Sequence, residues 1–367
     1  MSLNFTEKFI KIKIYILLIF FISPSFILAN ETNIYSFKNI EIYMEDDNSF
    51  IAKENGIKNA IFEKFESLLK NLSVNPIDIN LEKFNPEDYL KNLVIKNEII
   101  TEKKYIALID IYFDKEKVIN LYKNENILFS DTISPTFLIL SSHNFDGTDI
   151  LWEKNNWNFF WSNLDNNIHQ LNIKTPELNN KNKILLSSED IYNLNLINID
   201  NILNYYDLNQ TILITATKKY YSDNGQIYID LLITSYNKED KSLENIYSKN
   251  ILIEELKSEE ILSQLTLSSY DEIFKWWKSK TITYFNQLNQ ITCFMEINNI
   301  KSLNKIKDIL NSISHVDRIY LESLNSEDIK LKIFYYGKMQ EIINIFDLSN
   351  ISIIEQNNKC IIKNESI

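Results

Sequence analysis

The pattern of apolar and polar positions predicts a repeated order of strands and helices, first near the start of the chain. Alternating apolar residues predict a strand over residues 33–45, and apolar residues at helical spacing predict a helix after it. Two further strands follow at 93–100 and 105–113. A short helix capped by Asp114 and a strand at 127–129 complete the set. The order β-α-β-β-α-β is that of a ferredoxin-like unit.

The last part of the chain repeats this order. A helix with one apolar face follows the first strand, and Gly337 makes the turn into the second helix. The expected elements are a strand at 291–297, a helix at 303–313, strands at 316–321 and 329–334, a helix after Gly337, and strands at 351–354 and 360–362. We therefore predict a second ferredoxin-like module, although the two ends share no residue-level identity.

Between these modules the pattern predicts a central three-layer α/β domain. The continuous apolar run 137–140 predicts an inner strand that is buried on both faces. Asp149 is expected to cap the helix that follows, which carries three tryptophans. The remaining expected elements are a strand at 183–186, helices after Ser187 and at 199–206, a hairpin of strands 211–217 and 226–234 around Asp223-Asn224-Gly225, a strand at 242–251, and a long helix at 258–284.

The predicted fold class is thus α/β (α+β), with two ferredoxin-like βαββαβ modules flanking the central domain. We expect the domains to span residues 30–133, 134–288 and 289–367. In the middle one, Trp157, Phe160 and Trp161 share one helix face. Core packing is the expected role of the tryptophans, and an aromatic surface for a ligand or partner is the alternative.

The first 29 residues have a different composition from the rest. Lys8, Lys11 and Lys13 precede an apolar run at 14–22, and a short tail ends at Ala29. This pattern is typical of a secretory signal peptide, so we expect cleavage after Ala29 and a periplasmic protein. Retention of the segment as a membrane anchor is the alternative.

The charge of the chain bears on its possible partners, and its two cysteines bear on a possible disulfide. The net charge is −12 and Arg318 is the single arginine, which disfavours nucleic-acid binding because phosphate contacts need clustered Lys and Arg. Export permits a disulfide between Cys293 and Cys360. Two separate buried thiols are nevertheless the expected state, since sequence alone does not bring the cysteines together.

The candidate chemistry lies in the loop expected after the central strand. His143 stands there close to Asp146 and Asp149, and a histidine flanked by carboxylates can perform acid–base work. Trp152 and Trp157 follow and complete the predicted binding residues. The simpler interpretation is a polar surface loop with a helix cap. No catalytic residues are assigned.

Other chemistry is not indicated by the sequence. The three histidines lie far apart, no C-x-x-C occurs, and four scattered glycines supply no phosphate-binding loop, so no metal or cofactor is expected. Asp110 with Asp114, or Glu98 with Glu102, would form carboxylate pairs. Strand-facing charges and helix caps explain them more simply.

Four segments resemble one family. These segments are AKENGIKNAIFEKFESLLKNL, KNEIITEKKYIALIDIYFDKEKVINL, LWEKNNWNFFW and HVDRIYLESLNSEDIKLKIFYYGKMQEI. In that order they are similar to the first helix, the next strands, the tryptophan segment and the last module of an uncharacterised proteobacterial envelope family, catalogued as domain of unknown function 2066. The chain departs from it at Leu140-Ser141, where the family tends to have proline, and in using lysine for arginine. The resemblance implies a periplasmic protein of unknown role and supplies no catalytic residues.

These observations lead to three functional hypotheses. The first is a non-enzymatic binding or assembly factor of the cell envelope, with envelope proteins as partners and an oligomeric state left open. The second is an envelope hydrolase that uses the loop around His143. The third is a small-ligand receptor that uses the tryptophan face.

Overall fold

The computed structural model describes residues 33–75, 83–152, 155–164, 170–221, 226–253, 257–295, 300–324, 329–356 and 359–364. These residues build a mixed α/β protein with three sheets, which confirms the predicted class. Residues Ile34–Ile367 form one compact unit. The predicted signal segment 1–29 and the predicted turn at 223–225 lie outside the described residues.

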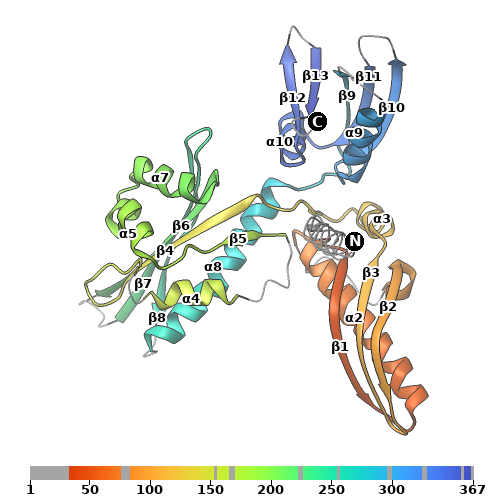
Figure 1. The fold of residues 1–367 in the computed structure, drawn as a ribbon, viewed down its shortest axis with the longest axis horizontal. Coiled ribbons are helices and arrows are strands. Elements are labelled where there is room, and N and C mark those ends of the chain that lie inside the picture. Colours follow the sequence, from red (N-terminus) through yellow and green to blue (C-terminus); the bar gives the residue numbers. More distant parts are fainter. Residues whose placement is uncertain are drawn as a thin grey trace, which may run out of the picture. The chain divides into compact units, whose positions relative to one another are not determined.

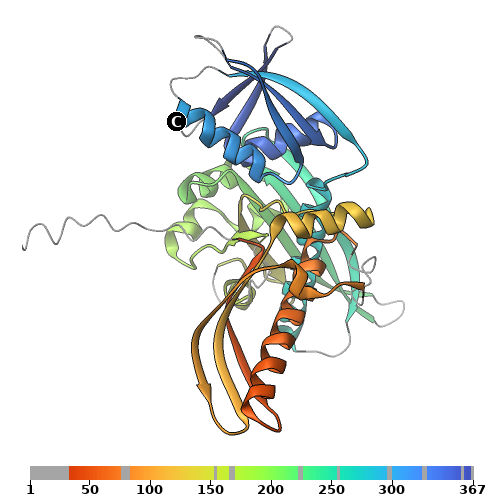
Figure 2. The same ribbon diagram turned by 90° about the vertical axis from the view of Figure 1, so that its right-hand side faces the viewer.

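The amino-terminal module is a three-stranded antiparallel sheet with a long helix against it. The strands lie in the order β1-β3-β2, and α2 packs on β1 and β3 (Figure 1; Figure 2). The elements are β1 (Ser36–Glu45), α2 (Ser49–Leu72), the 3-10 turn η3 (Pro86–Tyr89), β2 (Leu90–Ile100), β3 (Lys104–Phe113) and α3 (Lys115–Glu125).

Local signals explain how these helices begin and why α2 lies so close to the sheet. The Asn48 side chain accepts hydrogen bonds from the first free amides of α2, and Asp114 does the same for α3. At Gly56 a β-carbon would lie 2.8 Å from Cγ2 of Ile42 and 3.2 Å from Cβ of Met44. Glycine at this position therefore permits the close approach of α2 to β1.

The strand predicted at 127–129 does not form, so the first module, as far as the structure describes it, lacks the fourth strand of the expected unit. Phe129 makes only isolated bridges, to Ser73 and to Thr283. Its ring is fully buried against those of Tyr122 and Phe285. Burial of this aromatic ring and the bonds to the end of α2 hold the segment away from the edge of β1.

The middle sheet has five strands in the order β5-β4-β6-β7-β8. The strand β4 (Thr136–Asn144) is parallel to both of its neighbours, which confirms the predicted inner strand. The other elements are α4 (Asn156–Ser162), β5 (Asn172–Lys174), α5 (Asn180–Leu185), α6 (Ser188–Tyr192), α7 (Leu196–Tyr206), β6 (Gln210–Tyr221), β7 (Gln226–Asn237), β8 (Ser242–Ile253) and α8 (Ser258–Lys280).

Both faces of this sheet are covered by apolar side chains. Phe137 and Ile139 of β4 join a core with α4 and α8, whereas Leu138 and Leu140 join a second core with α6 and α7. Because successive side chains of a strand point to opposite faces, a continuous apolar run suits a sheet that is covered on both sides.

Three predictions in this region are wrong. The segment 183–186 belongs largely to the helix α5 rather than to a strand, because Asn179 caps a short turn there. The tryptophan helix begins at Asn156 and is capped by Asn155, not by Asp149. The long helix α8 ends at Lys280, four residues earlier than expected.

The carboxyl-terminal module has the sheet order β10-β11-β9-β13-β12. Its elements are β9 (Leu288–Met295), α9 (Ile300–Ser312), β10 (Val316–Leu324), β11 (Ile329–Tyr336), α10 (Met339–Leu348), β12 (Ile351–Gln356) and β13 (Lys359–Asn364). The predicted strands and helices are confirmed. The last strand, β13, lies parallel to β9 and fills the position on its outer side.

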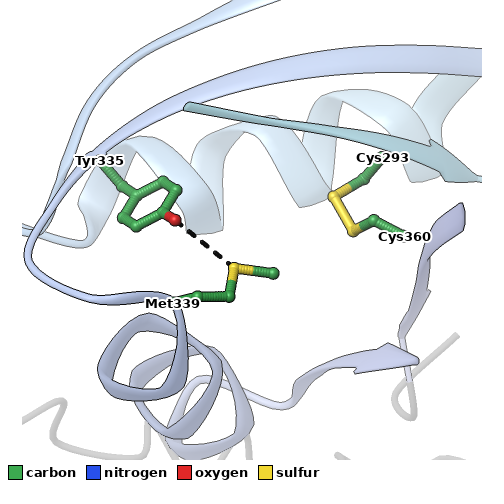
Figure 3. The surroundings of a disulfide bond; sticks show 4 residues. All are labelled: Cys293, Tyr335, Met339 and Cys360. Carbon is green, nitrogen blue, oxygen red and sulfur yellow. Dashed lines mark hydrogen bonds between the residues drawn. A yellow bond between two sulfur atoms is a disulfide. The ribbon is translucent and has the colours of Figure 1, made fainter. Parts of the chain in front are cut away.

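The expectation of two separate thiols is wrong. Cys293 of β9 and Cys360 of β13 lie directly opposite each other, with their Cα atoms 4.4 Å apart, and form a disulfide (Figure 3). The pairing of two strands that are 67 residues apart in sequence brings the cysteines together. The side-chain pattern predicted each strand but not which strands become neighbours.

Among the described residues, no helix has the length and apolar content that a membrane crossing requires.

Candidate functional site

The structure places His143 inside β4 rather than in a loop after it. Its backbone N–H and C=O bond to Ile150 at 3.1 and 2.8 Å, so residues 143–150 form a closed turn. The imidazole is buried between Phe145 and Trp157, with ring centres 5.1 and 6.2 Å away. The sequence predicted a polar loop here because the strand was expected to end earlier.

Asn144 organises the turn after the strand. Its Nδ2 donates to a carboxylate oxygen of Asp149 at 2.7 Å, and its Oδ1 accepts from the N–H of Gly147 at 2.9 Å. Gly147 has φ +81°, a conformation that favours glycine. Asp146 and Asp149 are exposed, so the turn carries its carboxylates at the surface while the histidine is covered.

The electrostatic surroundings of His143 favour the neutral ring. Burial lowers the pKa of His143, and the nearby charge of Asp146 only partly opposes this effect. Its Nδ1 is buried and makes no hydrogen bond within the described part of the chain. An acid–base role needs a group that lies within reach of the proton it transfers, and no carboxylate of the described residues orients the ring.

The tryptophans of the predicted site lie in two different cores. Trp157 is 0% exposed and packs with α8 on one face of the middle sheet. Trp152 is 7% exposed, packs on the other face and donates to the carbonyl oxygen of Leu186 at 2.6 Å. Trp161 is 2% exposed. The expected core role is confirmed, and the alternative of an aromatic surface on this helix is wrong.

A different feature, which the sequence did not reveal, is a groove along β1. It has a volume of about 440 Å³ and lies between the outer side of β1 and the helix α2. Ile40, Ile42 and Met44 line it from the strand, and Gly56 and Ala60 line it from the helix. Within the described residues β1 is the last strand on this side of its sheet.

The face of the same sheet that points away from α2 carries an apolar row. Tyr43, Ile106 and Ile99 are cross-strand neighbours on β1, β3 and β2. They are 65%, 39% and 61% exposed. Sheets normally bury an apolar face against another layer, so this row is a candidate contact surface for a partner.

The carboxylates considered as pairs have other roles. Asp110 forms an ion pair with Lys96 at 2.8 Å, and Glu98 forms one with Lys53 at 2.6 Å. Burial opposes the charge of Asp110, but hydrogen bonds from Lys96 and the Asn39 amide outweigh it and lower its pKa.

Two further buried charged groups contact residues near the ends of the first module. Asp131 accepts hydrogen bonds from Tyr35 and Ser314 and pairs with Lys115 at 2.8 Å. Burial alone would raise the pKa of Asp131, but the Lys115 charge and these hydrogen bonds lower it. These contacts hold the segment that follows α3 in place.

Lys278 of α8 is the second such group. Its Nζ donates to the carbonyl oxygen of Ser73, just beyond α2, at 2.6 Å. Burial, followed by repulsion from Lys275, lowers the pKa of Lys278 to about 8. No group of three or more His, Cys, Asp or Glu side chains suited to a metal ion occurs among the residues that the structure describes.

No protein-family model matches this chain, and the comparison with curated proteins finds no match. The resemblance to the envelope family therefore rests on the sequence segments quoted above.

Proposed function

We propose that this protein is an exported, non-enzymatic binding or assembly factor of the cell envelope. Its two terminal modules are variants of the ferredoxin-like unit, and the first of them supplies the binding surface. The predicted signal segment and the likeness to a periplasmic family support the location. The Cys293–Cys360 disulfide fits an oxidising compartment as well.

The observation that carries this proposal is the exposed row of Tyr43, Ile106 and Ile99. Three large side chains stand side by side on a sheet face that α2 does not cover. Burial of this row by a partner contributes a favourable free energy of roughly 25 cal/mol for each Å² of apolar surface removed from water. The tryptophans and His143 make no comparable surface.

Crosslinked affinity capture from an envelope extract tests the binding role. The triple variant Tyr43→Ser, Ile99→Ser and Ile106→Ser is compared with a control that changes Ile184, Ile197 and Leu252 to serine, three exposed apolar residues elsewhere in the chain. We expect an envelope protein that the wild type and the control capture and the triple variant does not. Equal capture by both variants, or capture of no reproducible protein, contradicts the proposal.

The alternative of a hydrolase keeps one supporting feature, the buried Nδ1 of His143, which makes no hydrogen bond to the described residues. It would need an opening of the turn at 143–150 to reach a substrate. Replacement of His143 by glutamine should abolish hydrolysis of an envelope substrate if this alternative holds, and leave capture unchanged under our proposal.

Amino-terminal sequencing of the protein purified from its native compartment tests the location. We expect the first residue to be Asn30, and a chain that starts at Met1 contradicts cleavage.

A further inference from the structure

We propose that β1 pairs antiparallel with β1 of a second copy, so that two three-stranded sheets join into one six-stranded sheet. This inference goes beyond the proposed function and does not depend on it. It rests on the outer side of β1, whereas the binding role rests on the face of the sheet.

The backbone of β1 is arranged for such pairing. The N–H of Asp46 bonds to the carbonyl oxygen of Lys103, and the same register pairs Met44 with Tyr105 and Ile42 with Ala107. In an antiparallel ladder only alternate residues bond to the neighbouring strand. The N–H and C=O groups of residues 41, 43 and 45 therefore point to the outer side.

The opposite edge of the same sheet is less suited to pairing. The strand β2 has register shifts at Leu90/Asn92 and again at Ile95/Asn97. Such bulges are a common protection of edge strands, because they disturb the row of donors and acceptors. In β1 the single shift lies near its start, and residues 40–45 are regular.

The distribution of charge along β1 favours a second copy as the occupant. Lys38 lies near the start of the strand, Glu45 is its last residue and Asp46 follows it. An antiparallel pair related by a two-fold axis brings the start of one strand beside the end of the other. Each lysine then faces the acidic end of the other copy.

One register brings each lysine near the acidic end of the other copy without placing like charges opposite each other. With Ile42 at the two-fold axis, Glu41 lies opposite Tyr43 and Ile40 lies opposite Met44 of the second copy, while Lys38, in the bulge before Ile40, lies near the acidic end. Moving the axis to residue 41 sets Glu41 against Glu41, and moving it to residue 43 sets Glu41 against Glu45. Like charges directly opposite each other destabilise a strand pair.

The helix layer is compatible with this register. Neighbouring strands lie about 4.8 Å apart, and α2 packs over both β1 and β3. A second copy then places the two α2 axes about 10 Å apart, which is the spacing of packed helices.

The molecular mass of the purified protein in solution, from sedimentation equilibrium, is the first test. Glu41→Pro removes an outward N–H without touching the bonds to β3, and Glu41→Ala keeps it. We expect a dimer for the wild type and Glu41→Ala, and at least a tenfold weaker dimer for Glu41→Pro. A monomeric wild type, or equal dimerisation of both variants, overturns the proposal. Circular dichroism checks that both variants are folded.

Single cysteines test the register. At the two-fold axis, Ile42→Cys sets two Cα atoms about 4.5 Å apart, within disulfide range, whereas residues 41 and 43 meet their own copies only at about 7–8 Å. Mild oxidation should crosslink Ile42→Cys and neither Glu41→Cys nor Tyr43→Cys. Crosslinking at 41 or 43 but not at 42 contradicts this register, and crosslinking at none of the three overturns the pairing.

The dimer proposal and the partner-binding proposal can be contradicted separately. Loss of capture in the triple serine variant with an intact dimer, or loss of the dimer in Glu41→Pro with intact capture, separates the two proposals.

Discussion

The first and last sheets share an order of elements: a strand, a long helix, two antiparallel strands and a second helix. They differ in the course of the chain after the second helix. After α10 the chain returns to the sheet as the pair β12 and β13, and β13 lies beside β9. After α3 the chain leaves the sheet, and Phe129 bridges Ser73 and Thr283 instead.

This difference shows how one arrangement of elements serves two purposes. The last sheet fills the outer side of its first strand with its own chain and fixes it by a disulfide. In the first sheet no described strand lies on the equivalent side of β1, and the face of the sheet has an exposed apolar row. We infer that the last module is built for stability and the first for contact.

Loss of the disulfide should have the largest effect and should be confined to the last sheet. The bond closes a loop of 67 residues, and the chain-entropy argument gives a stabilisation of about 4 kcal/mol. We expect the double variant Cys293→Ser and Cys360→Ser to lose protection in hydrogen exchange in β9 and β13. Equal loss in β1 and β3 would contradict the separation of the two modules.

The free energy of unfolding should depend on pH because Lys278 of α8 is buried against Ser73 of the first module. Below pH 8 the lysine is charged both folded and unfolded, and its burial opposes folding. Between pH 8 and 10.5 the unfolded chain retains a proton that the folded chain has lost, so stability rises with pH.

The measurement compares the free energy of unfolding of the wild type with that of Lys278→Met at several pH values. The difference should move in favour of the wild type by on the order of 3 kcal/mol between pH 7.5 and 10.5. Other titrating groups are common to both proteins and cancel. A constant difference would show that Lys278 keeps its ordinary pKa.

The variant Gly56→Ala tests the close approach of α2 to β1. Overpacking against Ile42 and Met44 should cost about 1–3 kcal/mol, and the better helix propensity of alanine returns about 1 kcal/mol. We expect a net loss of about 1 kcal/mol in chemical denaturation. Asn59→Ala, at an exposed position of the same helix, should instead stabilise the protein slightly.

The smallest expected change in stability concerns the left-handed asparagine that follows the second helix in both modules. Asn126 ends α3 with φ 52°, and Asn350 follows α10 with φ 58°. Glycine adopts this left-handed conformation without a steric penalty. Asn126→Gly and Asn350→Gly should each raise stability by less than about 1 kcal/mol, and a loss at either position would show that the asparagine side chain is needed there.

Local patterns predicted most elements, and pairing between distant segments was the part that they missed. The cap at Asp114 and the apolar run of β4 follow from neighbouring residues, and both are confirmed. The segment 127–129 has the composition of a strand, but the burial of Phe129 depends on Phe285, which lies far away in sequence. The disulfide escaped prediction for the same reason.

The candidate site was predicted in part. The sequence placed His143 in a loop after the central strand, whereas the residue lies within β4. The sequence could not show that the backbone of Ile150 pairs with that of His143, because this contact forms only when the turn closes. The groove along β1 had no sequence signal of its own, since it exists because no described strand lies on the outer side of β1.

Because β9 pairs with β13, this part of the last sheet cannot form until both strands have been synthesised. Ribosomes add roughly 5–20 residues per second, so the 67 residues between Cys293 and Cys360 take about 3–13 s to make. During that interval β9 has been translated, but its parallel neighbour β13 does not yet exist. For those seconds the side of β9 that β13 later covers is open to other extended segments.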